Sequence, residues 1–393
     1  MESNLTPQKL WNLGFICFAL VNFIISAAFS MAMPIIAGYI VNMGATLAFA
    51  GFITGLMAFV SLFTRPFASL LGDRLNKKKL LIVSTFATGV IMVFYAFVPG
   101  IMWLVPTRIL HGIFFSVSGT LAFALGTYYI PGKRMAEGVG FLGVGQVIGR
   151  AVGPNTGIYL SENYSYELCF IISGIILVTA GLSIIAIRYE HSVSKTPGTA
   201  DGKSSASFKF NDLIAVELLP NAFFAGLLVL GGGLANSYLV LLGAHRSISN
   251  IGLFFVVNAL VTLAARPILG KLADRKGIAY TIIPGFILIS MSMLVIAFSQ
   301  SLWPLLFSAV LLAIGGGALP ALQSECLRML SPERKTLATG TYFIGLDTCI
   351  GLGTIIGGAS IDYLGFGFTF GSVSFLMLAG LGIYLRHSRP VRL

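Results

Sequence analysis

Apolar runs of about 20 residues or more, separated by short polar stretches, recur along the whole sequence. The hydrocarbon core of a bilayer is about 30 Å thick, so a helix needs about 20 apolar residues to cross it. Such a segment must be helical, because no water inside the bilayer satisfies an open backbone. Composition agrees, since only 10% of the residues are charged, against about 25% in soluble domains. The runs predict an all-α integral membrane protein.

A polar stretch at 189–212, rich in Ser, Lys, Gly and Thr, separates two groups of apolar runs. It has too little apolar surface to fold alone and is interpreted as a cytoplasmic linker. The expected domains are therefore a six-helix half at 1–188 and another at 213–393. The twelve expected transmembrane helices lie near 11–40, 47–70, 80–98, 102–127, 137–160, 167–188, 213–242, 249–270, 279–298, 302–327, 337–360 and 366–385.

Basic residues indicate the orientation, because Lys and Arg concentrate in cytoplasmic loops. Nearly all of the 25 Lys and Arg fall on one side if the N-terminus is inside. This predicts a multi-pass protein of the cytoplasmic membrane with both termini in the cytoplasm. Anionic lipid of the inner leaflet accounts for the net charge of +11 without a nucleic-acid partner.

A short motif occurs twice. Arg65-Pro66 followed by Asp73-Arg74 recurs 201 positions later as Arg266-Pro267 followed by Asp274-Arg275. Parallel repeats of six helices are one of the architectures that transporters use.

The second copy, Gly270 to Gly277 (GKLADRKG), resembles the signature between helices 2 and 3 of the major facilitator superfamily. It keeps Gly270, Asp274, Arg275 and Gly277, and the degenerate first copy keeps Asp73 and Arg74. In the fifth expected helix, Gly149, Gly153, Pro154 and Gly157 resemble the antiporter motif of drug and proton exporters. Arg108 with His111-Gly112 resembles a helix 4 motif of the same family.

The resemblance implies the major facilitator fold, with the first motif acting in gating. An aspartate at a cytoplasmic helix end can pair with an arginine across the interface of the halves in one state only. We expect this of Asp73 and Asp274. Glycines four apart let helix backbones approach closely, and Pro154 bends its helix.

Charges within apolar helices cost several kcal/mol unless paired or hydrated, on the order of 2.5–3.5 on insertion scales. Three residues qualify, namely Arg108, Arg150 and Asp347. Arg108 is either a functional intramembrane charge or snorkels to the outer surface. Arg150 and Asp347 lie near the midplane and either couple protons or form a structural ion pair. Asp347 is the only carboxylate deep within an expected helix, so it is the candidate proton carrier.

Several chemistries find no support. The sequence has no phosphate-binding GxxxxGK[ST] loop, no HExxH and no clustered histidines, so we expect no enzyme activity, no cofactor and no metal site. The resemblance also implies that helices 1, 4, 7 and 10 line a central cavity. The candidate substrate contacts are therefore Asn22, Ser26, Arg108, Asn236, Tyr238 and Gln323.

The resemblance implies a secondary active efflux transporter, of the kind found in multidrug resistance, that exports a small organic molecule in exchange for protons. Two alternatives stay open. A cationic Arg150 beside the cavity favours an anionic metabolite or a metallophore as the substrate. The second alternative is a receptor-like protein that has this fold but no longer transports. We expect a monomer.

Overall fold

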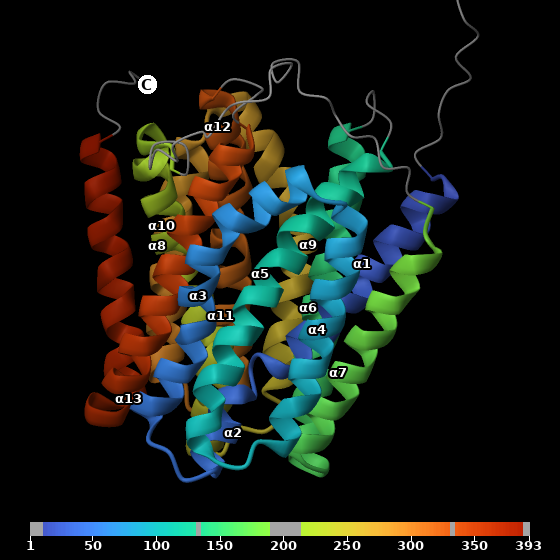
Figure 1. The fold of residues 1–393 in the computed structure, drawn as a ribbon. Coiled ribbons are helices and arrows are strands. Elements are labelled where there is room, and N and C mark those ends of the chain that lie inside the picture. The colour runs from blue at the N-terminus through green and yellow to red at the C-terminus, as the bar shows by residue number, and fades with distance from the viewer. Residues whose placement is uncertain (1–10, 131–134, 189–213, 331–334, 388–393) are drawn as a thin grey trace, which may run out of the picture.

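The computed structural model of the chain describes residues 11–130, 135–188, 214–330 and 335–387. Within these ranges the side chains of 69–70, 72–74, 123–124, 127, 135–140 and 335–336 are not described. The expected linker at 189–212 lies outside the described residues. In Figure 1 the described part is a bundle of long helices that run roughly side by side. We call the end of the bundle that carries both termini the termini end, and the other the α2 end.

The first group of helices covers residues 13–186. A break after Ala32 divides the first helix, so that α1 and α2 together make one passage. The helices are α1 (Leu13–Ala32), α2 (Ile36–Asn42), α3 (Leu47–Arg74), α4 (Lys77–Phe94), α5 (Leu104–Tyr128), α6 (Met135–Asn163) and α7 (Tyr166–Ser183). Short 3₁₀ turns lie at Tyr95–Phe97, Ile101–Trp103 and Ile184–Ala186.

The second group covers residues 216–387 and begins with a 3₁₀ turn at Val216–Leu218. Here α11 and α12 form one passage, and α13 contains two helices joined at Gly365, whose φ of 81° suits a residue without a side chain. The helices are α8 (Leu219–His245), α9 (Gly252–Lys276), α10 (Ala279–Phe298), α11 (Leu302–Gly315), α12 (Ala318–Met329) and α13 (Lys335–His387).

Helix starts follow from side chains that accept the free N–H groups of a first turn. Asn12, Thr46, Asn76 and Ser165 each accept a hydrogen bond from the backbone three residues later. These caps explain why α1, α3, α4 and α7 begin where they do, each within a few residues of the expected boundary.

Ten of the described segments are long and apolar enough to cross a membrane. One of these, Leu337–His387, has 51 residues, which suffices for two passages at about 1.5 Å per residue. Helix α6 has 29 residues and is long enough for a further passage. The chain is therefore an all-α, multi-pass membrane protein, as the sequence predicts.

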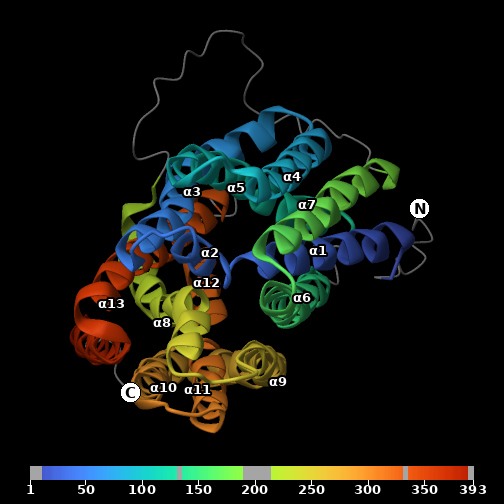
Figure 2. The ribbon, with the colours of Figure 1, turned by 90° about the horizontal axis from the view of Figure 1, so that it is seen from below.

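Two interfaces join the two groups of helices. Helix α3 packs along α13, and α6 packs along α9. Figure 2 shows α13 and α8 to α11 on one side and α1 and α4 to α7 on the other, with α6 beside α9. We name these contacts the α3–α13 interface and the α6–α9 interface.

Backbones of the two groups approach most closely toward the α2 end. A Cβ built on Gly51 would lie 2.8 Å from the Cα of Gly358, and one on Gly55 would overlap the Gly351 carbonyl oxygen. The Ala48 N–H also donates to the Asp362 carboxylate at 3.2 Å. Close glycine packing of this kind holds membrane helices together through van der Waals contact. The α2 end of the α3–α13 interface is thus closed.

Candidate functional site: charges at the two helix interfaces

Asp347 forms an ion pair with Arg65 across the α3–α13 interface. The Arg65 Nε donates to Asp347 Oδ2 at 2.5 Å, and Nη2 donates to Oδ1 at 3.4 Å. The guanidinium carbon also lies 4.6 Å from the centre of the Phe343 ring, one turn earlier on α13. Both charged side chains are nearly buried, at 12% and 11% exposed. The expected midplane carboxylate therefore has a cationic partner, on the opposite group of helices.

Arg65 lies midway in the sequence of α3 between two lipid-facing residues, so its side chain points inward. Phe63 and Phe67 are both strongly exposed, on the outer side of α3. A residue two positions from each lies about 200° round the helix, since each residue turns about 100°. Arg65 thus faces the interior of the bundle.

Arg150 has the same placement on α6. Ile148 and Val152 are exposed apolar residues of that helix, and Arg150 lies two positions from each, on the opposite side. Its side chain is also exposed. Because protein atoms nevertheless surround it, it faces a solvent-accessible space inside the bundle.

Arg266 completes the pattern on α9, between the exposed residues Ala264 and Ile268. Its Nη1 reaches α6, where it lies 3.2 Å from the position that a Cβ on Gly143 would take. It is close enough to Arg150 to repel that guanidinium electrostatically. Within the part of the chain that the structure describes, neither arginine has an ion pair or a hydrogen-bond partner.

Sequence reasoning missed the roles of Arg65 and Arg266, which were taken only as part of the excess of basic residues on the cytoplasmic side. Both lie on helices within candidate membrane spans, Leu47–Ala68 and Gly252–Lys276. A signal was available in the sequence. Each arginine stands midway between two apolar or small residues four positions apart, which places it on the opposite helix face.

Arg108 is fully buried and does not snorkel to the surface. Its Nε donates to the Ile53 carbonyl at 3.1 Å and its Nη2 to the Thr54 carbonyl at 3.2 Å. The Tyr95 hydroxyl lies 3.5 Å from Nη1. The snorkelling interpretation is wrong because these acceptors hold the guanidinium inside the first group, where it joins α5 to α3.

The glycines of the expected antiporter motif lie against α1. A Cβ on Gly149 would lie 2.8 Å from the Ala27 nitrogen. Cβ atoms on Gly153 and Gly157 would overlap the carbonyl oxygens of Ala27 and Met31. The close backbone approach that the spacing predicts is present, and Pro154 lies within the continuous helix α6.

The expected gating aspartate Asp274 pairs with Arg328 at 3.0 Å. This pair does not cross the interface of the halves as expected, because α9 and α12 belong to the same group of helices. Both side chains are largely exposed, at 68% and 63%. The N-terminal counterparts, Asp73 and Arg74, have side chains outside the described residues. Gly277 ends α9 with a φ of 96°, a conformation that favours glycine.

The expected cavity residues differ in their surroundings. Tyr238 is fully buried and its hydroxyl donates to the Thr354 carbonyl at 2.5 Å, so it packs between helices in this conformation. Asn22 is 6% exposed. Ser26 donates to the Gln146 carbonyl on α6 at 3.1 Å, one turn before Arg150. Asn236 and Gln323 are half-buried.

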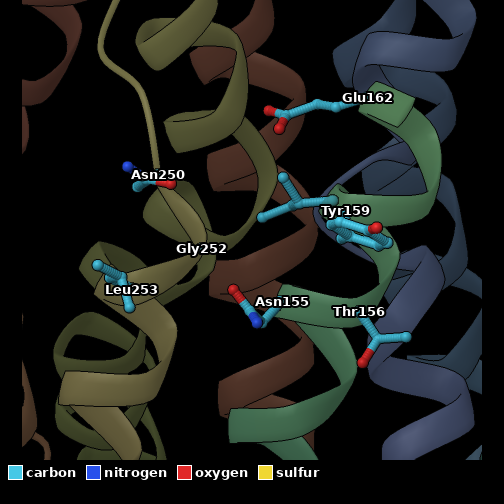
Figure 3. Close-up of a pocket in the computed structure, with 8 residues that line it drawn as sticks. Asn155, Thr156, Tyr159, Glu162, Asn250, Gly252 and Leu253 are labelled. Atoms are coloured by element: carbon cyan, nitrogen blue, oxygen red, sulfur yellow. The ribbon is translucent and has the colours of Figure 1, made fainter.

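A cavity of about 520 Å³ lies at the α2 end of the α6–α9 interface. Figure 3 shows Asn155, Tyr159 and Glu162 of α6 opposite Asn250 and Gly252. The Asn155 side chain also fills the space where Gly252 has no Cβ. This interface thus carries a carboxylate at its α2 end and two arginines deeper in the bundle.

The described residues contain no cluster of three or more His, Cys, Asp or Glu side chains placed to hold a metal ion. The charged groups described at the two interfaces include the arginines, Asp347 and Glu162.

Comparison with known proteins agrees with this architecture. The sequence profile of the Major Facilitator Superfamily matches residues 18–246 and 222–392. An uncharacterized MFS-type transporter of Methanocaldococcus jannaschii is 25% identical over 368 residues, covering 91% of this chain and 93% of that protein. The multi-drug resistance efflux pump PmrA homolog of Lactococcus lactis is 25% identical and covers 85% of this chain and 84% of its own.

Among solved structures, a bacterial homolog of the human lysosomal transporter Spinster, in an inward-facing and occupied conformation, superimposes with a TM-score of 0.76. It is 14% identical, with 95% of this chain and 96% of that chain covered, so the likeness is one of fold. With its membrane-spanning helices and a family profile that covers nearly the whole chain, this protein is a transporter of the Major Facilitator Superfamily and not an enzyme.

Proposed function

We propose that this protein is a proton-coupled exporter of a small organic molecule, with Asp347 and Arg65 as the coupling pair. The observation that carries the proposal is the ion pair across the α3–α13 interface. The name of the Lactococcus lactis relative, an efflux pump, supports the outward direction. The glycine packing of α6 on α1 supports an antiporter.

Protonation of Asp347 gives the pair its mechanism. A charged pair held between two helices keeps them together, and removing one charge leaves the other without its partner, which is strongly unfavourable in a buried place. When Asp347 takes up a proton, Arg65 loses its anionic partner and α3 and α13 separate more easily. When the proton leaves, the pair forms again. The proton therefore changes the equilibrium between two arrangements of the halves.

Alternating access follows if the closed α2 end opens in the other state. The termini end is proposed to face the cytoplasm, because the basic loops lie there, and the membrane is the cytoplasmic one. In the arrangement described, the α2 end is closed by glycine contacts while Arg150 is exposed inside the bundle. Solute reaching Arg150 in this arrangement comes from the cytoplasm, and opening of the α2 end releases it outside.

The first test compares metabolites and cationic dyes inside and outside cells with and without the protein. Any compound that is exported is then followed in everted vesicles with an imposed pH gradient. A protonophore should abolish uphill transport, and ATP depletion should not while the gradient is held. Transport that needs ATP in sealed vesicles would contradict proton coupling.

Asp347→Asn tests the coupling pair. The amide keeps the shape of the side chain and part of its hydrogen bonding, but it carries no charge and does not titrate. We expect the variant to fold, to bind solute, and to lose at least about 90% of uphill transport, the size of effect produced by about 1.4 kcal/mol of lost coupling.

Asp362→Asn is the matched control, since Asp362 is on the same helix and also contacts the opposite group, at the exposed α2 end. It should retain proton-driven transport. Equal proton release on solute binding by the wild type and Asp347→Asn would assign coupling to another group.

The receptor-like alternative is resolved by the same vesicles. A receptor would bind a compound and change conformation without accumulating it against a gradient.

A further inference from the structure

The α6–α9 interface holds two guanidinium groups that are close enough to repel each other electrostatically. Arg150 faces a solvent-accessible space inside the bundle, and Arg266 reaches from α9 to the surface of α6 at Gly143. Both point away from the lipid-facing side of their helices. The two positive charges are therefore on the inner side of the interface between the halves.

No described carboxylate compensates these charges. Seven Asp and Glu side chains are described, and only Asp274 and Asp347 form ion pairs with arginine among those residues. The repulsion between Arg150 and Arg266 is consequently not offset by protein groups in this part of the chain. Like charges brought together in a membrane protein are unfavourable unless an anion joins them.

The repeat shows what is unusual about this arrangement. Arg65 and Arg266 occupy equivalent positions in the two copies of the motif, 201 residues apart. Arg65 binds the carboxylate of Asp347 on α13, whereas Arg266 reaches α6 at Gly143 and is repelled by the guanidinium of Arg150 on the same helix. Among the described residues, Arg65 has a carboxylate partner, whereas Arg150 and Arg266 have none.

We propose that Arg150 and Arg266 form a binding site for an oxyanion, a carboxylate, phosphate or sulfate group carried by the transported solute. This identifies the substrate of the proposed exporter as a small organic anion, and to that extent it rests on the proposed function. Guanidinium groups bind oxyanions through two parallel N–H donors, which gives both charge and geometry. The bound anion takes the place that Asp347 occupies in the other interface.

The position favours a solute over a lipid headgroup as the source of the oxyanion. Both arginines lie about 200° round their helices from exposed apolar residues, so they are on the side that lipid does not contact. Solute entering the interior space reaches Arg150 directly. A lipid phosphate would have to pass between α6 and α9.

The test is an anion-binding measurement on the purified full chain in a maltoside detergent. Thermal unfolding is followed in sulfate and in citrate, against potassium chloride of the same ionic strength. A ligand that binds only the folded state raises the unfolding temperature in a saturable way. We expect such a rise for the wild type, with the half-saturating concentration increased at least about tenfold in Arg150→Gln and in Arg266→Gln.

Three further variants make the result specific. Arg386→Gln removes an exposed positive charge in the last turn of α13 and should behave as the wild type. Arg150→Lys keeps the charge and should retain part of the anion response. Arg150→Glu should form an internal pair with Arg266, so its unfolding temperature without anion should exceed that of the wild type and should not respond to sulfate or citrate.

Lipid is tested separately by adding phosphatidylglycerol to the detergent. Stabilisation by phosphatidylglycerol alone, abolished in Arg150→Gln, would overturn the assignment to the solute and leave a lipid site. An equal response to sulfate in every variant, or no response in the wild type, would overturn the site itself. These measurements involve no gradient, so their outcome does not depend on whether the protein exports a solute. Anion binding in detergent without transport in vesicles would contradict the proposed export but support the anion site.

Discussion

Four arginines on the transmembrane helices differ in the groups that lie near them. Arg108 binds two carbonyl oxygens of α3 and is completely enclosed. Arg65 binds a carboxylate on the opposite group of helices. Arg150 and Arg266 repel each other electrostatically at the α6–α9 interface. The surroundings of Arg108 suit a residue that holds helices together, and those of Arg65 suit a contact that forms in one state. The surroundings of Arg150 and Arg266 suit the binding of an anion.

Replacement of Arg108 should therefore reduce stability before it changes transport. Arg108→Leu removes the charged hydrogen bonds to the carbonyls of Ile53 and Thr54, each worth about 1.5–3 kcal/mol. We expect a lower unfolding temperature in detergent. Transport per folded molecule should stay near that of the wild type.

Arg108→Lys is the informative comparison, because a single ammonium group cannot reproduce the fork that bonds two separate carbonyls. It should be destabilised nearly as much as Arg108→Leu. A variant that unfolds at the wild-type temperature but no longer transports would show that Arg108 contacts the solute.

At the scale of helices, glycines determine how closely α6 approaches α1. Gly157 contacts the Met31 backbone so closely that a Cβ would overlap it, whereas a Cβ on Gly145 of the same helix would meet its nearest atom at an ordinary 3.6 Å. The two positions provide a matched pair for substitution.

Gly157→Ala should destabilise the protein by about 1–3 kcal/mol, because the helices must move apart to accept the methyl group. Gly145→Ala should be neutral or stabilising by up to about 1 kcal/mol, since alanine favours the helix and finds room. Unfolding in detergent measures both. Equal stability of the two variants would contradict tight packing of α6 on α1 as a structural requirement.

The sequence predicted the helices well and the direction of their charged side chains poorly. Apolar length and caps such as Asn12 and Thr46 depend on local sequence, so the passages and their starts could be predicted. Whether Arg266 faces a loop or the interior depends on the rotation of α9, which packing against α6 and α11 decides. The pairing of Asp347 with Arg65 joins residues 282 positions apart, and nothing local specifies it. A residue-by-residue comparison of the two copies of the repeat would have given the most additional information on these side chains.

At the scale of the whole molecule, the two interfaces carry different charged groups. The α3–α13 interface carries a titratable pair and closes at the α2 end through Gly51 and Gly358. The α6–α9 interface carries the arginine pair and the cavity at its α2 end. Coupling requires that binding of an anion at one interface and a proton at the other favour opposite arrangements of the same halves.

This picture requires the α2 end to open during transport, and a disulfide across the α6–α9 interface tests it. The Cβ position of Gly252 lies 3.4 Å from the Asn155 Cα, near enough for a bond between cysteines. Asn155→Cys combined with Gly252→Cys, with the four native cysteines replaced, should form that bond on oxidation. Transport in vesicles should then stop, and a reductant should restore it, because only the crosslink prevents the halves from separating there.

The control crosslink joins helices of one group. Asn258 on α9 donates to the Ala309 carbonyl on α11 at 3.1 Å, so Asn258→Cys with Ala309→Cys is bridged by a short bifunctional thiol reagent. This pair moves as one body if the halves rock as units, and transport should continue. Full transport with the Asn155–Gly252 crosslink complete would show that the α2 end of the α6–α9 interface stays closed throughout the cycle, and the exit path would have to lie elsewhere.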